Sequence, residues 1–206
     1  MNVSNVTIQV DDIVLEFFNN TSSLGKEVSQ LWLDALQFLN DAERMKSPEK
    51  RERLLRASIL TAAAAFEAWT NFLADRIAQA GEVAGGRLGE FEIDCLREKH
   101  KVLQKGKVKD ERKLYSAKDR FLLLFRLLSG DKEFPDEMLS RLEKSFEVRD
   151  EVVHPKPGIS INLGENRRGH DAVYGFLQAD LILSKVWGGR KFTATPRGTF
   201  ASLGSG

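Results

Sequence analysis

The stretch Ala57–Ala74 constrains the fold more than any other part of this chain, because its eighteen residues carry a single charge, Glu67. A membrane span normally needs about 20 strongly apolar residues. This stretch is instead rich in alanine and includes Ser58, Thr61 and Thr70. We therefore expect a buried helix rather than a membrane span. A helix with so little charge must be covered by other elements on most of its circumference.

Turn and cap signals set the ends of this helix. Ser47 is a favourable N-cap residue, and Pro48 fits the first helical turn. Gly81 follows the last apolar residues, and a glycine at that place favours helix termination. The sequence predicts a helix over residues 48–80.

The remaining helices are predicted from apolar residues spaced three and four positions apart. They fall at residues 24–46, 91–104, 117–129, 135–154 and 170–188. Between them, four glycines in residues 81–90 predict a loop. The charged residues 105–116 predict a loop or an exposed extension.

Strand signals are short and sparse. Weak alternation predicts a hairpin within residues 3–18, and short apolar runs predict strands at 159–163 and 191–195. The predicted fold class is all-α, an antiparallel helical bundle with small accessory β elements near both ends. We divide the chain into an N-terminal hairpin at 1–20, a helical domain at 21–188 and a tail at 189–206.

Composition excludes several classes of protein. The 206 residues carry 31 basic and 30 acidic side chains, so the chain is not a global polycation that coats nucleic acid. The single cysteine, Cys95, rules out an internal disulfide and a cysteine-based zinc site. No glycine-rich nucleotide loop and no metal-binding histidine motif occurs, so we expect no cofactor and no metal. The start of the sequence lacks signal-peptide features, and we expect a cytoplasmic protein.

One short motif combines groups that suit phosphate chemistry. Arg149, Asp150 and His154 converge at the end of an amphipathic helix, just before Pro155. An arginine holds phosphate and stabilises developing charge. A histidine exchanges protons near neutral pH. Residues five apart on a helix lie about 140° apart, so the pair meets one substrate only if the helix frays or a second copy faces it.

Glu67 is the second candidate site residue, since one acid in a nearly uncharged helix either faces solvent or meets a partner. In the functional interpretation, Glu67 orients Arg149 or lines the same cleft, with Asn71 one turn further on. In the structural interpretation, neither motif is a functional site. His154 is then a histidine at a helix end, Arg149 belongs to a surface ion pair, and Glu67 is a solvated acid.

Residues 97–120 form the main basic segment. Ten lysines and arginines stand against four acids there. Such a segment is suited to phosphate contact, although a charge run is equally compatible with a solvated face. The candidate RNA-binding residues are Lys99, Lys101, Lys105, Lys107, Lys109, Arg112 and Lys113.

The Arg149-Asp150-x-x-x-His154 motif resembles that of the HEPN superfamily, the higher eukaryotes and prokaryotes nucleotide-binding domain. A second resemblance lies in residues 53–77, where a run of small residues leads into Phe66-Glu67, as in the early helix of one HEPN group. Together the resemblance covers about residues 24–188. It implies a HEPN-like bundle in which Arg149 and His154 are the catalytic pair.

The resemblance also implies an activity. Active HEPN members are metal-independent endoribonucleases in which two protomers bring their motifs into one cleft, and the ribose 2′-hydroxyl attacks the adjacent phosphate. Many are toxins or antiviral effectors that are silenced by an antitoxin protein. We therefore expect a homodimeric endoribonuclease with RNA as substrate and an antitoxin as a further partner.

Two other interpretations stay open at this point. Some HEPN-like proteins are non-catalytic modules that bind RNA, nucleotide or a protein partner through the same cleft. In the other interpretation the chain is a helical structural protein. The spacing of Arg149 and His154 is then accidental, because a motif this short can arise by chance.

Overall fold

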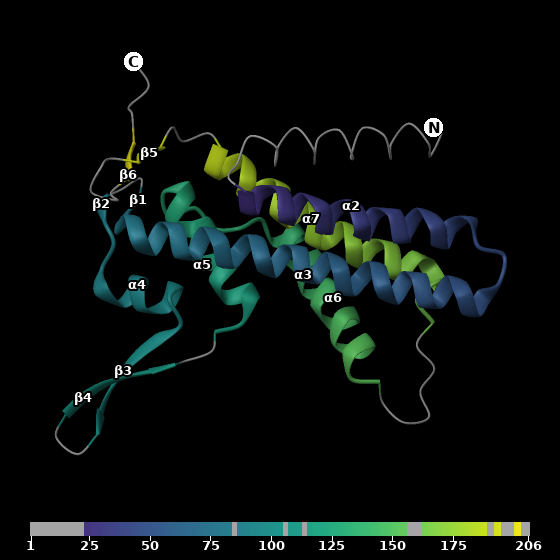
Figure 1. Ribbon diagram of the computed structural model, residues 1–206, viewed down its shortest axis with the longest axis horizontal. Helices are drawn as coiled ribbons and strands as arrows, with labels where there is room; N and C mark the ends of the chain where they lie inside the picture. Colours follow the sequence, from purple (N-terminus) through teal and green to yellow (C-terminus); the bar gives the residue numbers. More distant parts are fainter. Residues whose placement is uncertain are drawn as a thin grey trace. The chain divides into compact units, whose positions relative to one another are not determined.

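The computed structural model describes residues 23–83, 86–104, 107–112, 115–155, 162–188, 192–194 and 200–202. This part of the chain is predominantly helical, which confirms the all-α class (Figure 1). Its helices are α2 (Ser23–Arg44), α3 (Pro48–Ala80), α4 (Glu90–Leu96), α5 (Ala117–Ser129), α6 (Asp136–Val153) and α7 (Arg168–Gly188). A 3₁₀ turn, η1 (Glu165–Arg167), precedes α7.

The described strands form three separate two-stranded antiparallel pairs. They are β1 (Glu82–Val83) with β2 (Gly86–Arg87), β3 (Lys99–Gln104) with β4 (Lys107–Arg112), and β5 (Phe192–Ala194) with β6 (Phe200–Ser202). The hairpin expected within residues 3–18 lies outside the described residues. So does most of the strand expected at 159–163, whose last two residues are not in a strand.

The helix expected over 91–104 is wrong in its second half. Helix α4 ends at Leu96, and the chain then passes through Glu98, whose positive φ of 54° lies in the left-handed region. A residue in that conformation cannot continue a right-handed helix. Residues 99–104 pair with 107–112 in a continuous register from Lys99–Arg112 to Gln104–Lys107. Of the two alternatives predicted for 105–116, a loop or an exposed extension, the loop is wrong for 107–112, because these residues form a strand.

Helix α3 begins and ends as the sequence predicts. The Ser47 hydroxyl lies 3.5 Å from the backbone N–H of Lys50 at its start. At its end, Gly81 has a φ of +64° and donates its N–H to the carbonyl of Ile77. Among the described residues, no helix combines the length and apolarity needed to cross a lipid bilayer.

The chain divides into two compact units. The first comprises the residues up to Trp69 together with Pro135–Leu181, and the second comprises Thr70–Phe134 and the residues from Ile182 onward. Helices α3 and α7 each contribute to both units. The candidate site motif belongs to the first unit, and the basic segment belongs to the second.

The first unit packs α2, α6 and parts of α3 and α7 around an apolar core, and Figure 1 shows the long helices lying along one another. The Ser58 hydroxyl donates a 2.7 Å hydrogen bond to the Ala35 carbonyl, which ties α3 to α2. Three aromatic rings join α3, α6 and α7. The Phe66 centroid lies 5.6 Å from Phe146 and 5.5 Å from Phe176, and the last two are 4.9 Å apart.

The second unit has its own aromatic core. The ring of Phe134 lies 5.1 Å from both Phe121 and Phe125 of α5, in edge-to-face contact. Helix α5 begins at an N-cap, where Ser116 accepts a hydrogen bond from the Asp119 N–H. Its bounds match the predicted 117–129.

One carboxyl group lies in the core of the first unit. Asp180 is fully buried on α7, and its Oδ2 accepts a 3.0 Å hydrogen bond from the indole N–H of Trp32. Its other oxygen has no hydrogen-bond partner in the described part of the chain. Burial raises the pKa of Asp180 well above its usual range, because the charged form is poorly solvated there, and the single indole bond only partly opposes that effect.

This burial predicts how Asp180→Asn changes the pH dependence of stability. In the parent, the raised folded-state pKa means that stability is greatest below the unfolded-state pKa of about 4 and is lost as pH rises through the folded-state value. Asparagine keeps an acceptor for Trp32 and cannot ionise. We expect its free energy of unfolding to exceed that of the parent near neutral pH and to match it more closely near about pH 4, measured by urea unfolding. An identical pH profile for the two proteins would contradict the buried-carboxyl assignment.

Candidate functional site

Arg149 is positioned by the aromatic core of the first unit. Its guanidinium carbon lies 5.4 Å from the centroid of the Phe146 ring, three residues earlier on α6. Phe146 contacts Phe66, whose neighbour on α3 is Glu67. The packing of two rings therefore brings an acid on α3 and an arginine on α6 to one place.

Two carboxylates hold the Arg149 guanidinium. One terminal nitrogen, Nη2, lies 3.4 Å from Glu67 Oε1, and the other, Nη1, lies 3.2 Å from Asp150 Oδ1. The side chains of Arg149, Glu67 and Asp150 are 27%, 42% and 60% exposed, so solvent screens the ion pairs. The Nε of Arg149 is buried with no hydrogen-bond partner among the described residues. The guanidinium is thus oriented by its neighbours yet keeps unused hydrogen-bonding capacity.

His154 lies where α6 ends. It is the C-cap residue, with φ −122° and ψ 65°, and its backbone N–H donates a 2.8 Å hydrogen bond to the Asp150 carbonyl. The residue is exposed, as is Pro155 after it. Within the described ranges its imidazole makes no hydrogen bond or ion pair, so it is accessible to a ligand. The predicted site residues Glu67, Arg149 and Asp150 are joined by direct contacts, whereas His154 is joined to them only through the backbone of α6.

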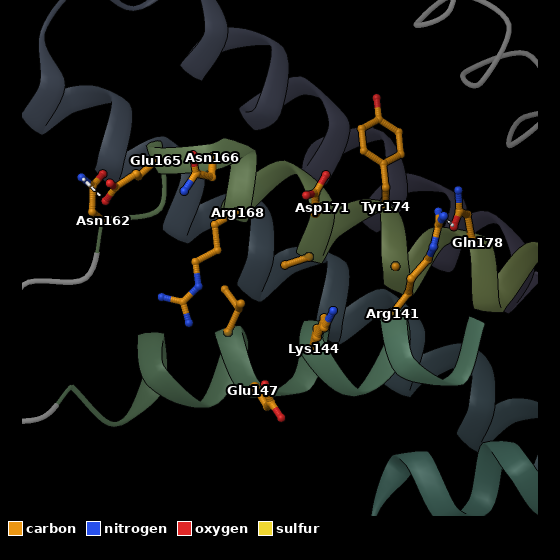
Figure 2. A pocket seen from close by; sticks show the side chains of 13 residues that line it. Arg141, Lys144, Glu147, Asn162, Glu165, Asn166, Arg168, Asp171, Tyr174 and Gln178 are labelled. Carbon is orange, nitrogen blue, oxygen red and sulfur yellow. Dashed lines mark hydrogen bonds between the residues drawn. The ribbon is translucent and has the colours of Figure 1, made fainter. Parts of the chain in front are cut away.

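A groove between α6 and α7 was not foreseen from the sequence. It encloses about 840 Å³ and is shown in Figure 2. The two helices approach closely on its floor, where a Cβ atom on Gly175 would meet the Ser145 hydroxyl at 2.1 Å. The groove is lined by Arg141, Lys144, Glu147, Val148, Asn162, Glu165, Asn166, Arg168, Asp171, Ala172, Tyr174, Gly175 and Gln178.

Cationic and anionic side chains are balanced in this groove, with three of each in the lining. Arg141 contacts Gln178, as Figure 2 shows, and also Glu137. Arg168 of α7 forms an ion pair with Glu151 of α6. The groove therefore has no single sign of charge. Its Arg168 end reaches the last turn of α6, three residues before His154. No sequence pattern links residues 151 and 168, so only the fold reveals their pairing.

The basic segment folds as a two-stranded ribbon. Lys99 and Lys101 lie in β3, and Lys107, Lys109 and Arg112 lie in β4. Lys107 and Lys109 are exposed. The remaining two candidates, Lys105 and Lys113, lie outside the described residues.

Arg120 of α5 fixes the point where this ribbon begins. Its Nη2 donates to Asn71 Oδ1 at 2.5 Å and lies 3.3 Å from Glu98 Oε1, and its side chain is largely buried. Glu98 is the residue whose positive φ turns the chain from α4 into β3. Asn71, which the functional interpretation places one turn beyond Glu67, accepts this hydrogen bond from Arg120.

The other two histidines lie away from this site. His170 Nε2 lies 3.0 Å from Glu43 Oε1, and burial lowers the pKa of this histidine. His100 lies in β3, opposite Glu111 in the register. In the part of the chain that the structure describes, no three histidine, cysteine or carboxylate side chains gather as a candidate metal-binding group.

Comparison of the chain with protein-family models, with characterised proteins and with solved structures gives no match. The site must therefore be interpreted from its own geometry and from the sequence motif.

The geometry predicts unequal stability effects at two neighbouring residues. Phe146→Ala removes a ring that two other rings contact, and we expect a loss of about 3 kcal/mol in the free energy of unfolding. Glu67→Gln removes one half of a partly exposed ion pair, so the expected loss is below about 1 kcal/mol. Urea unfolding of both variants measures this difference. Equal losses would mean that the ion pair, rather than the aromatic cluster, holds α3 and α6 together.

Proposed function

We propose that this chain is a HEPN-type, metal-independent endoribonuclease in which Arg149 and His154 carry the reaction. One observation carries the proposal. The oriented, partly exposed guanidinium of Arg149 and the accessible imidazole of His154 both lie near the end of α6. The motif resemblance supplies the reaction type. The biological setting that we propose, toxin–antitoxin or antiviral defence with an antitoxin partner, is supported by the resemblance alone.

The proposed reaction is an internal transfer at phosphorus. The ribose 2′-oxygen loses its proton and bonds to the adjacent phosphorus, the bond from phosphorus to the 5′-oxygen breaks, and that oxygen takes up a proton. The products are a 2′,3′-cyclic phosphate and a free 5′-hydroxyl. Imidazole suits these proton transfers, and a guanidinium suits the charge that develops on the phosphorane oxygens.

The contacts suggest a role for each carboxylate. Glu67 and Asp150 contact different nitrogens of Arg149 and so fix the plane of the guanidinium. The 3.4 Å contact with Glu67 is long for a charge-assisted hydrogen bond. A phosphate oxygen therefore competes with Glu67 for Nη2.

The decisive experiment is His154→Ala, assayed on RNA in the presence of EDTA. We expect cleavage to fall about 100-fold or more, since general acid–base catalysis is lost. The melting temperature should stay close to that of the parent, because an exposed helix-end histidine contributes about 1 kcal/mol or less. Arg149→Ala should lose a similar amount of cleavage. Arg149→Lys should recover little, because an ammonium lacks the planar fork.

The matched control is His170→Ala, which lies outside the ribbon that we propose below to contact RNA and should cleave like the parent. It removes the contact with Glu43, so its melting temperature is measured as well. Analysis of the product ends completes the test, since a 2′,3′-cyclic phosphate is required. Parental cleavage by a normally folded His154→Ala protein would refute the nuclease proposal at this site and favour a non-catalytic module.

We further propose that the β3–β4 ribbon contacts RNA phosphates. The exposed Lys107 and Lys109 lie on β4 within a segment rich in positive charge. Counterion release makes such binding steeply dependent on salt.

Reversing Lys107 and Lys109 to glutamate, in a His154→Ala background that leaves RNA intact, should weaken binding by about tenfold or more. Each lost phosphate contact lowers the slope of log affinity against log salt by about 0.7 on a single strand, so the slope should fall by about 1.4. Fluorescence anisotropy across a salt series measures both quantities. Reversing the exposed Lys132 and Lys185 gives the matched control. An unchanged slope of log affinity against log salt would mean that the ribbon is a solvated surface without RNA contacts.

A further inference from the structure

The groove between α6 and α7 adjoins His154 more closely than it adjoins Arg149. At 3.6 residues per turn, positions 147 and 154 differ by about 20° around the axis of α6, whereas positions 149 and 154 differ by about 140°. Glu147 lines the groove, and Glu151, three residues before His154, pairs with Arg168 at its end. The position of His154 therefore continues the α6 wall of the groove. A ligand that fills the groove and extends past Arg168 comes to the end of α6 at the histidine.

The guanidinium of Arg168 is oriented without being enclosed. It reaches from α7 toward α6, as Figure 2 shows, and there it forms an ion pair with Glu151. The two side chains are 39% and 43% exposed, so solvent has access to the pair. A guanidinium has five N–H donors, and a single carboxylate accepts from two of them in a bidentate pair. Arg168 can therefore bind a phosphate oxygen beside Glu151 or in exchange for it.

The polar side chains of the groove suit bases better than they suit a phosphate backbone. Asn166 and Asp171 lie exposed near Arg168, and Gln178 lies further along α7. Carboxamides both donate and accept hydrogen bonds, and carboxylates accept them from base amino groups. Sequence-specific RNA recognition uses such contacts with the edges of unpaired bases. A balanced set of charges is expected where bases enter a groove and only selected cations meet phosphates.

We propose that the groove between α6 and α7 is the subsite for the nucleotides beside the scissile phosphate. Arg168 binds a phosphate of this stretch, and Asn166 and Asp171 contact its bases. The RNA is single-stranded here, because pairing would occupy the base edges that these side chains meet. The identity of the ligand rests on the proposed nuclease function. Arg168 is thus a substrate-binding residue, and Asn166 and Asp171 determine specificity.

The direction of two effects on RNA binding tests the role of Arg168. In a His154→Ala background, which leaves RNA intact, Arg168→Gln should weaken binding of a single-stranded RNA oligonucleotide about tenfold, through loss of a charge-assisted hydrogen bond. Glu151→Gln should instead tighten binding, because the phosphate loses both a competitor and a repelling charge. A merely structural ion pair predicts the same direction for both variants, since each substitution breaks the same contact.

The matched control is the exposed ion pair between Arg126 and Asp131 in the second unit. Arg126→Gln and Asp131→Asn, in the same background, should leave the RNA affinity unchanged in fluorescence anisotropy. Melting temperatures are compared for all four variants, because ion pairs this exposed are expected to contribute little to stability. The proposal is overturned if Arg168→Gln and Glu151→Gln shift the affinity in the same direction, if neither shifts it, or if no RNA binds.

Mapping of cleavage sites tests the base contacts. The parent, Asn166→Ala and Asp171→Ala proteins digest the same RNA, and both variants should cut at sites with altered bases beside the cleaved bond. Ser140→Ala changes an exposed residue of α6 that is not among the groove-lining residues, and it should keep the sites of the parent. Unchanged sites in both groove variants overturn the base contacts.

The two experiments separate this subsite from the proposed function. RNA binding that responds in opposite directions to Arg168→Gln and Glu151→Gln, with a parent that does not cleave, supports the subsite and refutes the nuclease. Cleavage by the parent together with an RNA affinity that neither substitution changes refutes the subsite and leaves the nuclease standing.

Discussion

The contact among Phe66, Phe146 and Phe176 is the interaction on which the candidate site depends. Two edge-to-face contacts and one tilted contact hold the ring centroids 4.9–5.6 Å apart and so fix three helices at one point. Glu67 is the next residue after one ring, and Arg149 lies over the face of another. Apolar packing therefore sets the position of the polar site. Its own ion pairs orient the guanidinium, but they are too exposed to hold the helices together.

The helices of the first unit and α5 follow from the sequence because local signals and periodicity agree there. Ser47 and Pro48 mark the start of α3, Gly81 its end, and the apolar spacing between them leaves no alternative element. The helix expected over 91–104 fails because a single residue, Glu98, adopts a left-handed conformation. Its partner Arg120 lies 22 positions further along the chain, so the signal that ends α4 is not local.

Part of the candidate site was predictable from the sequence, and part was not. Glu67 stands out because it is the one charge in its stretch, and its contact with Arg149 is compatible with both the functional and the structural interpretation. The ion pair of Arg168 with Glu151 and the groove beside it arise from the antiparallel contact of α6 with α7. Charge pairs are abundant in a sequence with nearly equal numbers of acids and bases. Without the fold, nothing distinguishes the pairs that form from those that do not.

The close approach of α6 and α7 at Gly175 has a consequence for how this protein can change during evolution. A Cβ atom there would meet the Ser145 hydroxyl at 2.1 Å and the Arg141 carbonyl oxygen at 3.0 Å. Position 175 can gain a side chain only after position 145 loses its hydroxyl, and even then the backbone of α6 must yield slightly. The order of the two substitutions therefore matters, which is epistasis with a steric cause. A side chain at position 175 is therefore blocked while Ser145 keeps its hydroxyl, whereas position 145 can lose that hydroxyl first.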